Sequence, residues 1–237
     1  MNLLLALLAA GLTTLTDMPR ALPLAYAVAA PDMVVVRTAS AAADAAVPVD
    51  GLAGNWPSPL FSVSYDELGL AGLLRRDVFD EARRRVQQHA LSPRMLAIAD
   101  MSQPSTAKRL FVIDLVARKL VLQTYVAHGL NSGDLMATQF SNRNQSHQTS
   151  LGLYRVGARI SSPKHGPALL LDGLDKGIND SARAREIIIH GADYVSESFI
   201  AAHGRLGRSW GCPAVPRATM ARVIDLLADG GVLYVSG

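Results

Sequence analysis

The chain has a single cysteine, Cys212, in the stretch GRSWGCPAVP. A thiol becomes a nucleophile when it is held as a thiolate, which requires partial exposure and a nearby base or cation. Gly211 removes side-chain bulk beside the cysteine, so a substrate carbonyl can approach, and the N–H groups of Gly211 and Cys212 are candidate donors to an oxyanion. A buried structural cysteine is the alternative that these residues leave open.

A base for this thiol has to come from one of six histidines. His190 follows three consecutive isoleucines and precedes a glycine, so we expect a buried strand to hold its imidazole at the strand's end. His128 also stands before a glycine at the end of a predicted strand and is the second candidate. For His190 the alternative is a core histidine whose hydrogen bonds are satisfied.

Two other kinds of site are disfavoured by the motifs that the sequence lacks. A zinc site needs three or four ligands, and the chain has one cysteine and neither HExxH nor CxxC spacing. The GxSxG motif of many serine hydrolases is also absent. We therefore expect no metal and no cofactor.

The elements that must position these residues are mostly strands. Short apolar runs rich in Ile, Val and Leu predict them over 96–100, 108–129 (two strands that meet near 117–119), 149–160, 168–173, 186–192 and 232–236. Pro216 opens a predicted helix that Gly230 and Gly231 end. Many short strands with few helices predict a mainly β domain.

Helices are predicted ahead of these strands. Ser64 and Glu67 have the spacing of a capping box, and apolar residues recur at spacings of three and four from Phe79 to Ala90. Residues 31–60, rich in Ala, Pro and Ser, predict a flexible linker. The expected organisation is a signal peptide or anchor at 1–30, a linker at 31–60, a helical lead-in at 61–94 and a catalytic domain at 95–237.

The N-terminal residues predict export. The apolar run from Leu3 to Leu12 is too short to span a bilayer, and small residues between 25 and 29 match cleavage patterns. Exported domains normally pair their cysteines, so a lone thiol is expected to be buried or used. The net charge is +3 and the basic residues are scattered along the chain. The run Arg83 to Arg85 lies on a predicted helix face, so we expect no nucleic-acid partner.

Residues 186–216 resemble the active-site region of murein L,D-transpeptidases of the YkuD-type superfamily, in particular the divergent catalytic domain-like subgroup. That family has a strand ending in His-Gly and then Ser/Thr-His-Gly-Cys; here His190-Gly191 and Ser209-Trp210-Gly211-Cys212 take these places. Residues 108–129 resemble its opening hairpin, and TSLGLYRVG resembles its Thr-Pro-x-Gly-x-Phe strand. The resemblance covers 95–237 and implies a mainly β, YkuD-like β-sandwich or barrel with short helices, preceded by a small helical segment.

This resemblance implies cysteine acyl transfer on peptidoglycan stem peptides. Cys212, deprotonated by His190, would attack the carbonyl at the L-centre of a diaminopimelate residue, and an amine from a second stem would resolve the thioester. The alternatives are an L,D-carboxypeptidase that uses water, a transpeptidase with another donor position, and a peptidoglycan-binding module without catalysis. The expected partner is the sacculus and the expected location is the periplasm or cell wall; the oligomeric state is not indicated.

The sequence also departs from the family. Trp210 stands where the main family has histidine, and Pro213 begins an apolar run where the family has Asn-Arg. The missing histidine is not the general base in the usual assignment, so the thiol–imidazole pair survives while the donor pocket is lined differently. Arg205, Arg208 and Arg185 are candidates to bind substrate carboxylates through bidentate hydrogen bonds. The candidate substrate-binding residues are Arg208, Ser209, Trp210, Tyr194, His128 and Arg185.

Overall fold

The computed structural model describes residues 63–237. The predictions of an export signal at 1–30 and of a linker at 31–60 concern residues outside this range. No helix in the described range is long and apolar enough to cross a membrane.

The described residues form one mixed eight-stranded sheet with the order β3-β2-β1-β8-β4-β5-β6-β7. The strands are β1 (Met95–Asp100), β2 (Leu110–Asp114), β3 (Lys119–Thr124), β4 (Gly152–Ser162), β5 (Gly166–Gly173), β6 (Ile188–Ala192), β7 (Ala214–Pro216) and β8 (Val232–Ser236). The β1–β8 and β6–β7 pairs are parallel and the other pairs are antiparallel. The mainly β prediction is confirmed.

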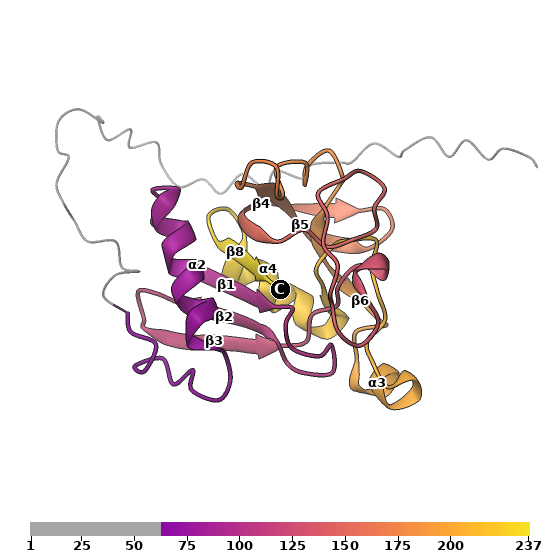
Figure 1. Cartoon of the computed structure of the whole chain (residues 1–237), viewed down its shortest axis with the longest axis horizontal. Coiled ribbons are helices and arrows are strands. Elements are labelled where there is room, and N and C mark those ends of the chain that lie inside the picture. The colour runs from indigo at the N-terminus through magenta and orange to yellow at the C-terminus, as the bar shows by residue number, and fades with distance from the viewer. Residues whose placement is uncertain (1–62) are drawn as a thin grey trace, which may run out of the picture. The chain divides into compact units, whose positions relative to one another are not determined.

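The central strands read as continuous apolar runs because both faces of the sheet are covered. In β1, Leu96 and Ile98 face one core, whereas Ala97 and Ala99 face the other. The first core is closed by helix α2 (Arg76–Gln88) and the second by helix α4 (Met220–Leu227), so the helices pack on opposite faces of the sheet (Figure 1). Burial on two faces explains why these strands lack polar alternation.

The two edges of the sheet come together next to the cysteine. Ala127, just after β3, forms an antiparallel bridge with Ala214 of β7, and Gly129 bridges to Ser209. This return of the chain onto β7 matches the expected barrel-like arrangement. It also encloses the segment that carries Cys212 between β6 and the 127–130 segment.

The helical lead-in is shorter than predicted. The capping box forms, since Ser64 Oγ accepts a hydrogen bond from the Glu67 N–H at 3.1 Å, but only turns follow it. Gly69 adopts a φ of +63° and ends this turn, so the predicted helix start at Ser64 is wrong. The helix predicted around Phe79 is α2, which packs on the sheet.

A buried carboxylate ties α2 to the rest of the domain. Asp175 accepts hydrogen bonds from the Leu153 N–H at 2.7 Å and from His89 Nε2 at 2.8 Å, and Arg85 lies 3.3 Å away. These contacts lower the pKa of Asp175 against the effect of its burial. The lead-in therefore belongs to the same packed unit as the sheet.

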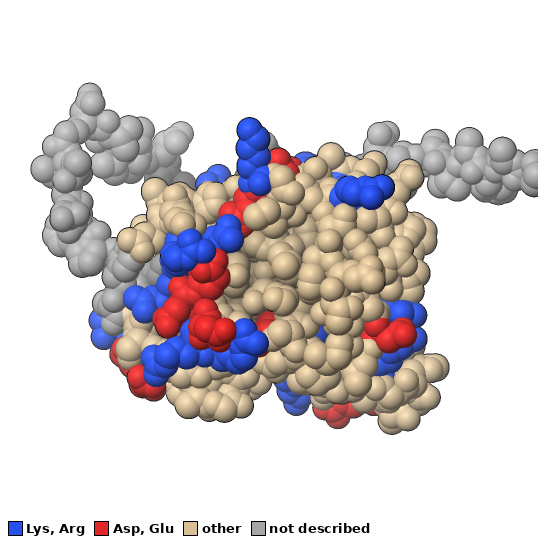
Figure 2. All heavy atoms as spheres, in the orientation of Figure 1, with Lys and Arg blue, Asp and Glu red and all other residues tan. Residues whose placement is uncertain are grey.

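The charged residues around α2 are mixed in sign. Figure 2 shows basic and acidic side chains interleaved on the side of the molecule where α2 lies. Within the helix, Arg84 and Arg85 pair with Glu81, and Arg83 lies 3.8 Å from Asp80. This run of arginines is a paired helix face and not a basic patch.

Candidate active site

The segment 209–212 is a tight turn that its own serine holds together. Ser209 Oγ accepts a hydrogen bond from the Gly211 N–H at 3.0 Å and donates one to the Cys212 carbonyl at 2.6 Å. Ser209 is 5% exposed, so this hydroxyl organises the turn and is shielded from a ligand. The Gly211 N–H is used inside the turn and is therefore unavailable to an oxyanion. Of the two predicted oxyanion donors, the Cys212 N–H remains available, because it donates no hydrogen bond to any described residue.

Glycine is required at position 211 for two reasons. Its φ of +119° lies in a region that L-residues rarely adopt, and a Cβ there would lie 2.8 Å from the Gln148 carbonyl oxygen. The same Cβ would lie 3.1 Å from Nη2 of Arg185. The Arg185 guanidinium donates hydrogen bonds to four oxygen acceptors in residues 141–150. These bonds fix it next to the turn that carries Cys212.

His190 lies in strand β6, but as the third of its five residues, so the prediction that it ends the strand is wrong: Gly191 and Ala192 continue the strand by pairing with β7. His190 is paired in parallel register with Ala214 of β7, two residues beyond Cys212. Its Nδ1 lies 3.2 Å from the carbonyl oxygen of Gly191. A carbonyl can only accept, so this contact favours the proton on Nδ1 and leaves the lone pair on Nε2.

His190 is almost fully buried, and burial lowers its pKa, with smaller contributions from the charges of Lys164 and Arg217. On one face its ring is stacked by His165, with ring centroids 3.8 Å apart. Burial, followed by the charges of His190, Lys164 and Arg217, lowers the pKa of His165 to about 4. Both imidazoles are therefore neutral at pH 7.

The thiol of Cys212 is partly exposed and sits against the apolar cluster formed by Ile160, Ala168 and Ile188. Burial raises the pKa of this thiol, whereas the charges of Arg185 and Lys164 lower it. Its Sγ lies 3.8 Å from the carbonyl oxygen of Glu186, and it forms no hydrogen bond with His190. The resting pair is thus a neutral thiol and a neutral imidazole.

A cavity of about 500 Å³ opens beside this turn. Its lining includes Trp210, Glu186, Gln145 and His147. The last three all have positive φ values, of 56°, 57° and 53°, which are uncommon for residues other than glycine. Strained backbone of this kind concentrates at functional sites, which favours this cavity as the place where a ligand binds.

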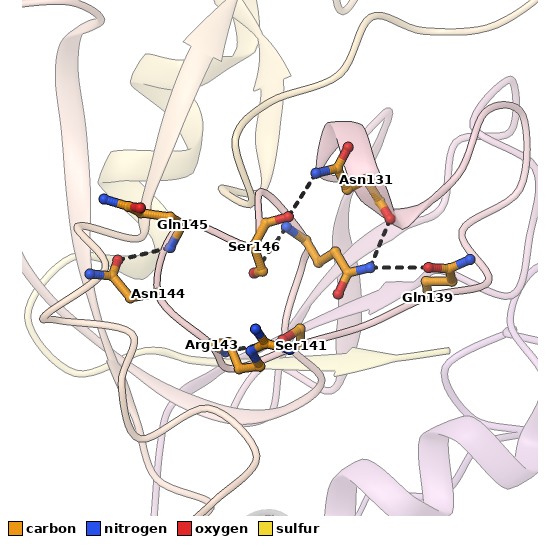
Figure 3. A pocket seen from close by; sticks show the side chains of 8 residues that line it. Asn131, Gln139, Ser141, Arg143, Asn144, Gln145 and Ser146 are labelled. Carbon is orange, nitrogen blue, oxygen red and sulfur yellow. Dashed lines mark hydrogen bonds between the residues drawn. The ribbon is translucent and has the colours of Figure 1, made fainter.

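A second, polar cavity of about 560 Å³ adjoins the first and shares Asn144 and Gln145 with it. Figure 3 shows its side chains, which are amides, hydroxyls and the guanidinium of Arg143. Asn131 donates to the Ser146 carbonyl at 2.9 Å, so part of this lining is held in place by its own hydrogen bonds. The two cavities together offer a polar, hydrogen-bonding surface that also carries the charges of Arg143, Arg185 and Glu186.

Two of the predicted substrate-binding residues are engaged in other contacts. His128 is 1% exposed, its Nδ1 accepts from Arg109 Nη2 at 2.8 Å, and its Nε2 donates to the Gly133 carbonyl at 3.1 Å. Burial and the charge of Arg109 lower its pKa to about 4, so it is a neutral core histidine. Arg208 pairs with Asp134 and also donates to the Gly133 carbonyl.

Of the two predicted aromatic residues, Trp210 lies in the cysteine turn, whereas Tyr194 packs on the apolar cluster around Leu206 and Ala214. Burial raises the pKa of the Tyr194 phenol, and the charge of a Cys212 thiolate adds to this effect. Trp210 is 64% exposed and stacks on His147, with centroids 4.8 Å apart and an interplanar angle of 16°. Trp210 thus forms an exposed aromatic wall beside the turn.

Sequence reasoning missed Lys164 and His165, which lie in the turn between β4 and β5. The ammonium of Lys164 is 4.4 Å from the centroid of the Trp210 ring, and His165 covers His190. No motif marks these residues. Their only signal is the polar Lys-His pair between two predicted strands, which says nothing about what the hairpin touches.

Nothing in residues 63–237 gathers three or more His, Cys, Asp or Glu side chains that could hold a metal ion. The chemistry that this arrangement can support is transfer of an acyl group to a partly exposed thiol, with a neutral imidazole nearby to accept its proton.

Comparison with solved structures gives several L,D-transpeptidases. Those from Mycobacterium smegmatis and Stackebrandtia nassauensis are each 14% identical to this chain with a TM-score of 0.38, covering 62% and 73% of it and 60% and 73% of their own chains. L,D-transpeptidase 1 of Mycobacterium tuberculosis is 12% identical with a TM-score of 0.36, covering 62% of this chain and 63% of its own. The chain therefore spans less than two thirds of these mycobacterial chains.

No curated protein matches the sequence. A family model does match, over residues 73–236, and its description is L,D-transpeptidase catalytic domain. The match includes α2, every strand and the segment that carries His190 and Cys212. This chain belongs to the L,D-transpeptidase catalytic domain family.

Proposed function

We propose that the protein is an L,D-transpeptidase that cross-links or remodels peptidoglycan through a thioester on Cys212. The observation that carries the proposal is the parallel register of β6 and β7, in which His190 lies beside Ala214, two residues after Cys212. Membership of the L,D-transpeptidase catalytic domain family supports it. The donor would be the stem peptide of one strand and the acceptor an amine of another.

His190 is proposed as the general base and acid. Its Nδ1 contact with Gly191 keeps the lone pair on Nε2, and its lowered pKa keeps the ring neutral and able to accept a proton. The thiol's raised pKa means that the proton moves as the C–S bond forms, rather than before the substrate arrives. His190 then gives this proton to the amine that leaves, and the C–N bond breaks.

The negative charge on the carbonyl oxygen needs donors during this step. The Cys212 N–H is proposed to supply one, since it makes no hydrogen bond to a described residue. The Ser209 hydroxyl stabilises the turn that orients the Cys212 N–H, and Arg185 adds positive charge next to this turn. Ser209 and Arg185 are thus positioning residues in this proposal.

The thioester is resolved by an amine of the second stem, which gives its proton to His190 as the thiolate leaves. Water at the same position would give the carboxypeptidase reaction. The polar cavity lined by Asn131, Gln139 and Asn144 adjoins the cavity lined by Trp210, so it has room for the amide groups of a second peptide. Placement of the acceptor decides between the two products.

The test is to incubate the purified protein with disaccharide tetrapeptides and separate the products by liquid chromatography with mass detection. The proposal predicts cross-linked dimers and released D-alanine with the wild type and neither with Cys212→Ala. The variant Cys212→Ser controls for the shape of the site. Trimmed monomers alone would replace the transpeptidase assignment with the carboxypeptidase, and Cys212-independent products would overturn the proposal.

A further inference from the structure

The hairpin between β4 and β5 reaches two separate groups of the site at its tip. Lys164 places its ammonium 4.4 Å from the centroid of the Trp210 ring, and the next residue, His165, stacks on His190 at 3.8 Å. Trp210 is held from the 141–150 loop as well, since His147 stacks on it. Lys164 therefore stands over the turn that carries the cysteine, on an aromatic support that is itself fixed.

Lys164 is an exposed cation without an acidic partner among residues 63–237. The three arginines expected to bind carboxylates have other partners. Arg208 and Arg205 both lie against Asp134, and Arg185 donates to four acceptors in residues 141–150. The charge of Lys164 acts on the thiol of Cys212 and on the ring of His190. Lys164 thus has capacity left to bind a ligand beside the cysteine turn.

We propose that Lys164, seated on Trp210, binds a carboxylate of the acyl donor next to the carbonyl that Cys212 attacks. The cation–π contact restricts the flexible lysine stem and points a compact charge at the site. A carboxylate bound there would partly neutralise the ammonium without displacing it from the ring. This inference rests on the proposed acyl transfer and adds the residue that selects an anionic donor.

Two donor carboxylates have the required chemistry: the one at the D-centre of the diaminopimelate residue and the C-terminal one of the departing D-alanine. Synthetic tetrapeptide donors in which one or the other is a carboxamide distinguish them. For the wild type, we expect amidation of the carboxylate that Lys164 binds to raise KM about two- to fivefold, the range of an exposed ion pair, with kcat little changed. In Lys164→Gln that penalty is expected to disappear, while amidation of the other carboxylate has the same effect in both proteins.

A second readout does not depend on the peptidoglycan reaction. Iodoacetate and iodoacetamide alkylate the same thiol, but only the first carries a carboxylate. The ratio of their rates on Cys212 therefore reports attraction of an anion and cancels changes in thiol reactivity. We expect Lys164→Gln to lower this ratio about two- to fivefold, and Lys176→Gln, a change at another exposed lysine, to leave it unchanged.

The aromatic support is tested in the same assay. Trp210→Ala is expected to lower the ratio as Lys164→Gln does, and Trp210→Phe to keep most of it, since a phenyl ring still accepts a cation. An unchanged ratio in Lys164→Gln would overturn the inference. If the ratio falls but no stem peptide reacts, the anion site stands and the proposed function fails. If peptides react but Lys164→Gln weakens charged and amidated donors equally, the carboxylate assignment is wrong.

Discussion

The turn that carries Cys212 depends on one hydroxyl, and its removal has a calculable cost. Ser209→Ala deletes the acceptor of the Gly211 N–H and the donor to the Cys212 carbonyl, both at a buried position. Two such hydrogen bonds contribute about 1–3 kcal/mol together. For a domain of this size, about 2–4 °C is lost per kcal/mol, so the melting temperature should fall by about 2–12 °C.

The assay is differential scanning calorimetry of wild type, Ser209→Ala and Ser161→Ala, in which an exposed serine of β4 is the control. Alkylation of Cys212 by iodoacetamide is followed in parallel. We expect Ser209→Ala alone to melt early, and its thiol rate to change because the turn no longer holds Cys212 in one orientation. A melting temperature within about 1 °C of wild type would correspond to a loss of only about 0.3 kcal/mol in the free energy of unfolding. That result would refute the reasoning about this turn.

Three further predictions concern the same region. Gly211→Ala should cost about 1–3 kcal/mol in the free energy of unfolding, measured in urea, because φ is +119° there, whereas Gly157→Ala should cost little. His128 has a pKa of about 4, against about 6.5 in an unfolded chain, so the unfolded state binds its proton first as the pH falls; stability should drop by about 3 kcal/mol from pH 6.5 to 4, and this share should vanish in His128→Gln. The charge of Glu186 raises the pKa of Cys212, so Glu186→Gln should shift the pH profile of alkylation to lower pH, and the same change at the exposed glutamate of helix α3 (Glu197–His203) should not. A profile that stays in place or moves upward would contradict the electrostatic account.

Most strands could be predicted because their apolar runs reflect local burial. β1, β2 and β8 are almost entirely apolar because helices cover both faces of the sheet. Strand β7 was not predicted, since its three residues form a strand only through pairing with β6 and Ala127, which the local sequence does not encode. Helix α3 escaped prediction because its seven residues include none that is buried, and so it lacks an amphipathic pattern.

The capping box at Ser64 shows the opposite error. The side-chain contacts predicted there do form, but a cap stabilises a helix only if the residues after it can continue one. Gly69 takes a left-handed conformation one turn later, and Leu70 and Leu74 turn into the core instead. Local hydrogen bonding was correctly predicted, and tertiary packing decided the outcome.

The candidate site divides in the same way. Cys212 and His190 could be proposed from residue types and spacing, since a lone thiol and an imidazole that follows a run of isoleucines are local features. Arg208 could not be judged from sequence, because its partner Asp134 is far away in the chain. Lys164 could not be predicted for the same reason, because its contact with Trp210 forms only when the β4–β5 hairpin packs against the cysteine turn.

The central claim is that Cys212 carries the acyl group and that His190 moves its proton. Intact-protein mass spectrometry after rapid acid quench, with an unreactive acceptor, tests it most directly. The account predicts one donor peptide, less its terminal D-alanine, covalently attached to Cys212 in the wild type, slow formation of the same adduct in His190→Ala, and none in Cys212→Ala. An adduct on another residue, or equal rates with and without the His190 imidazole, would contradict it.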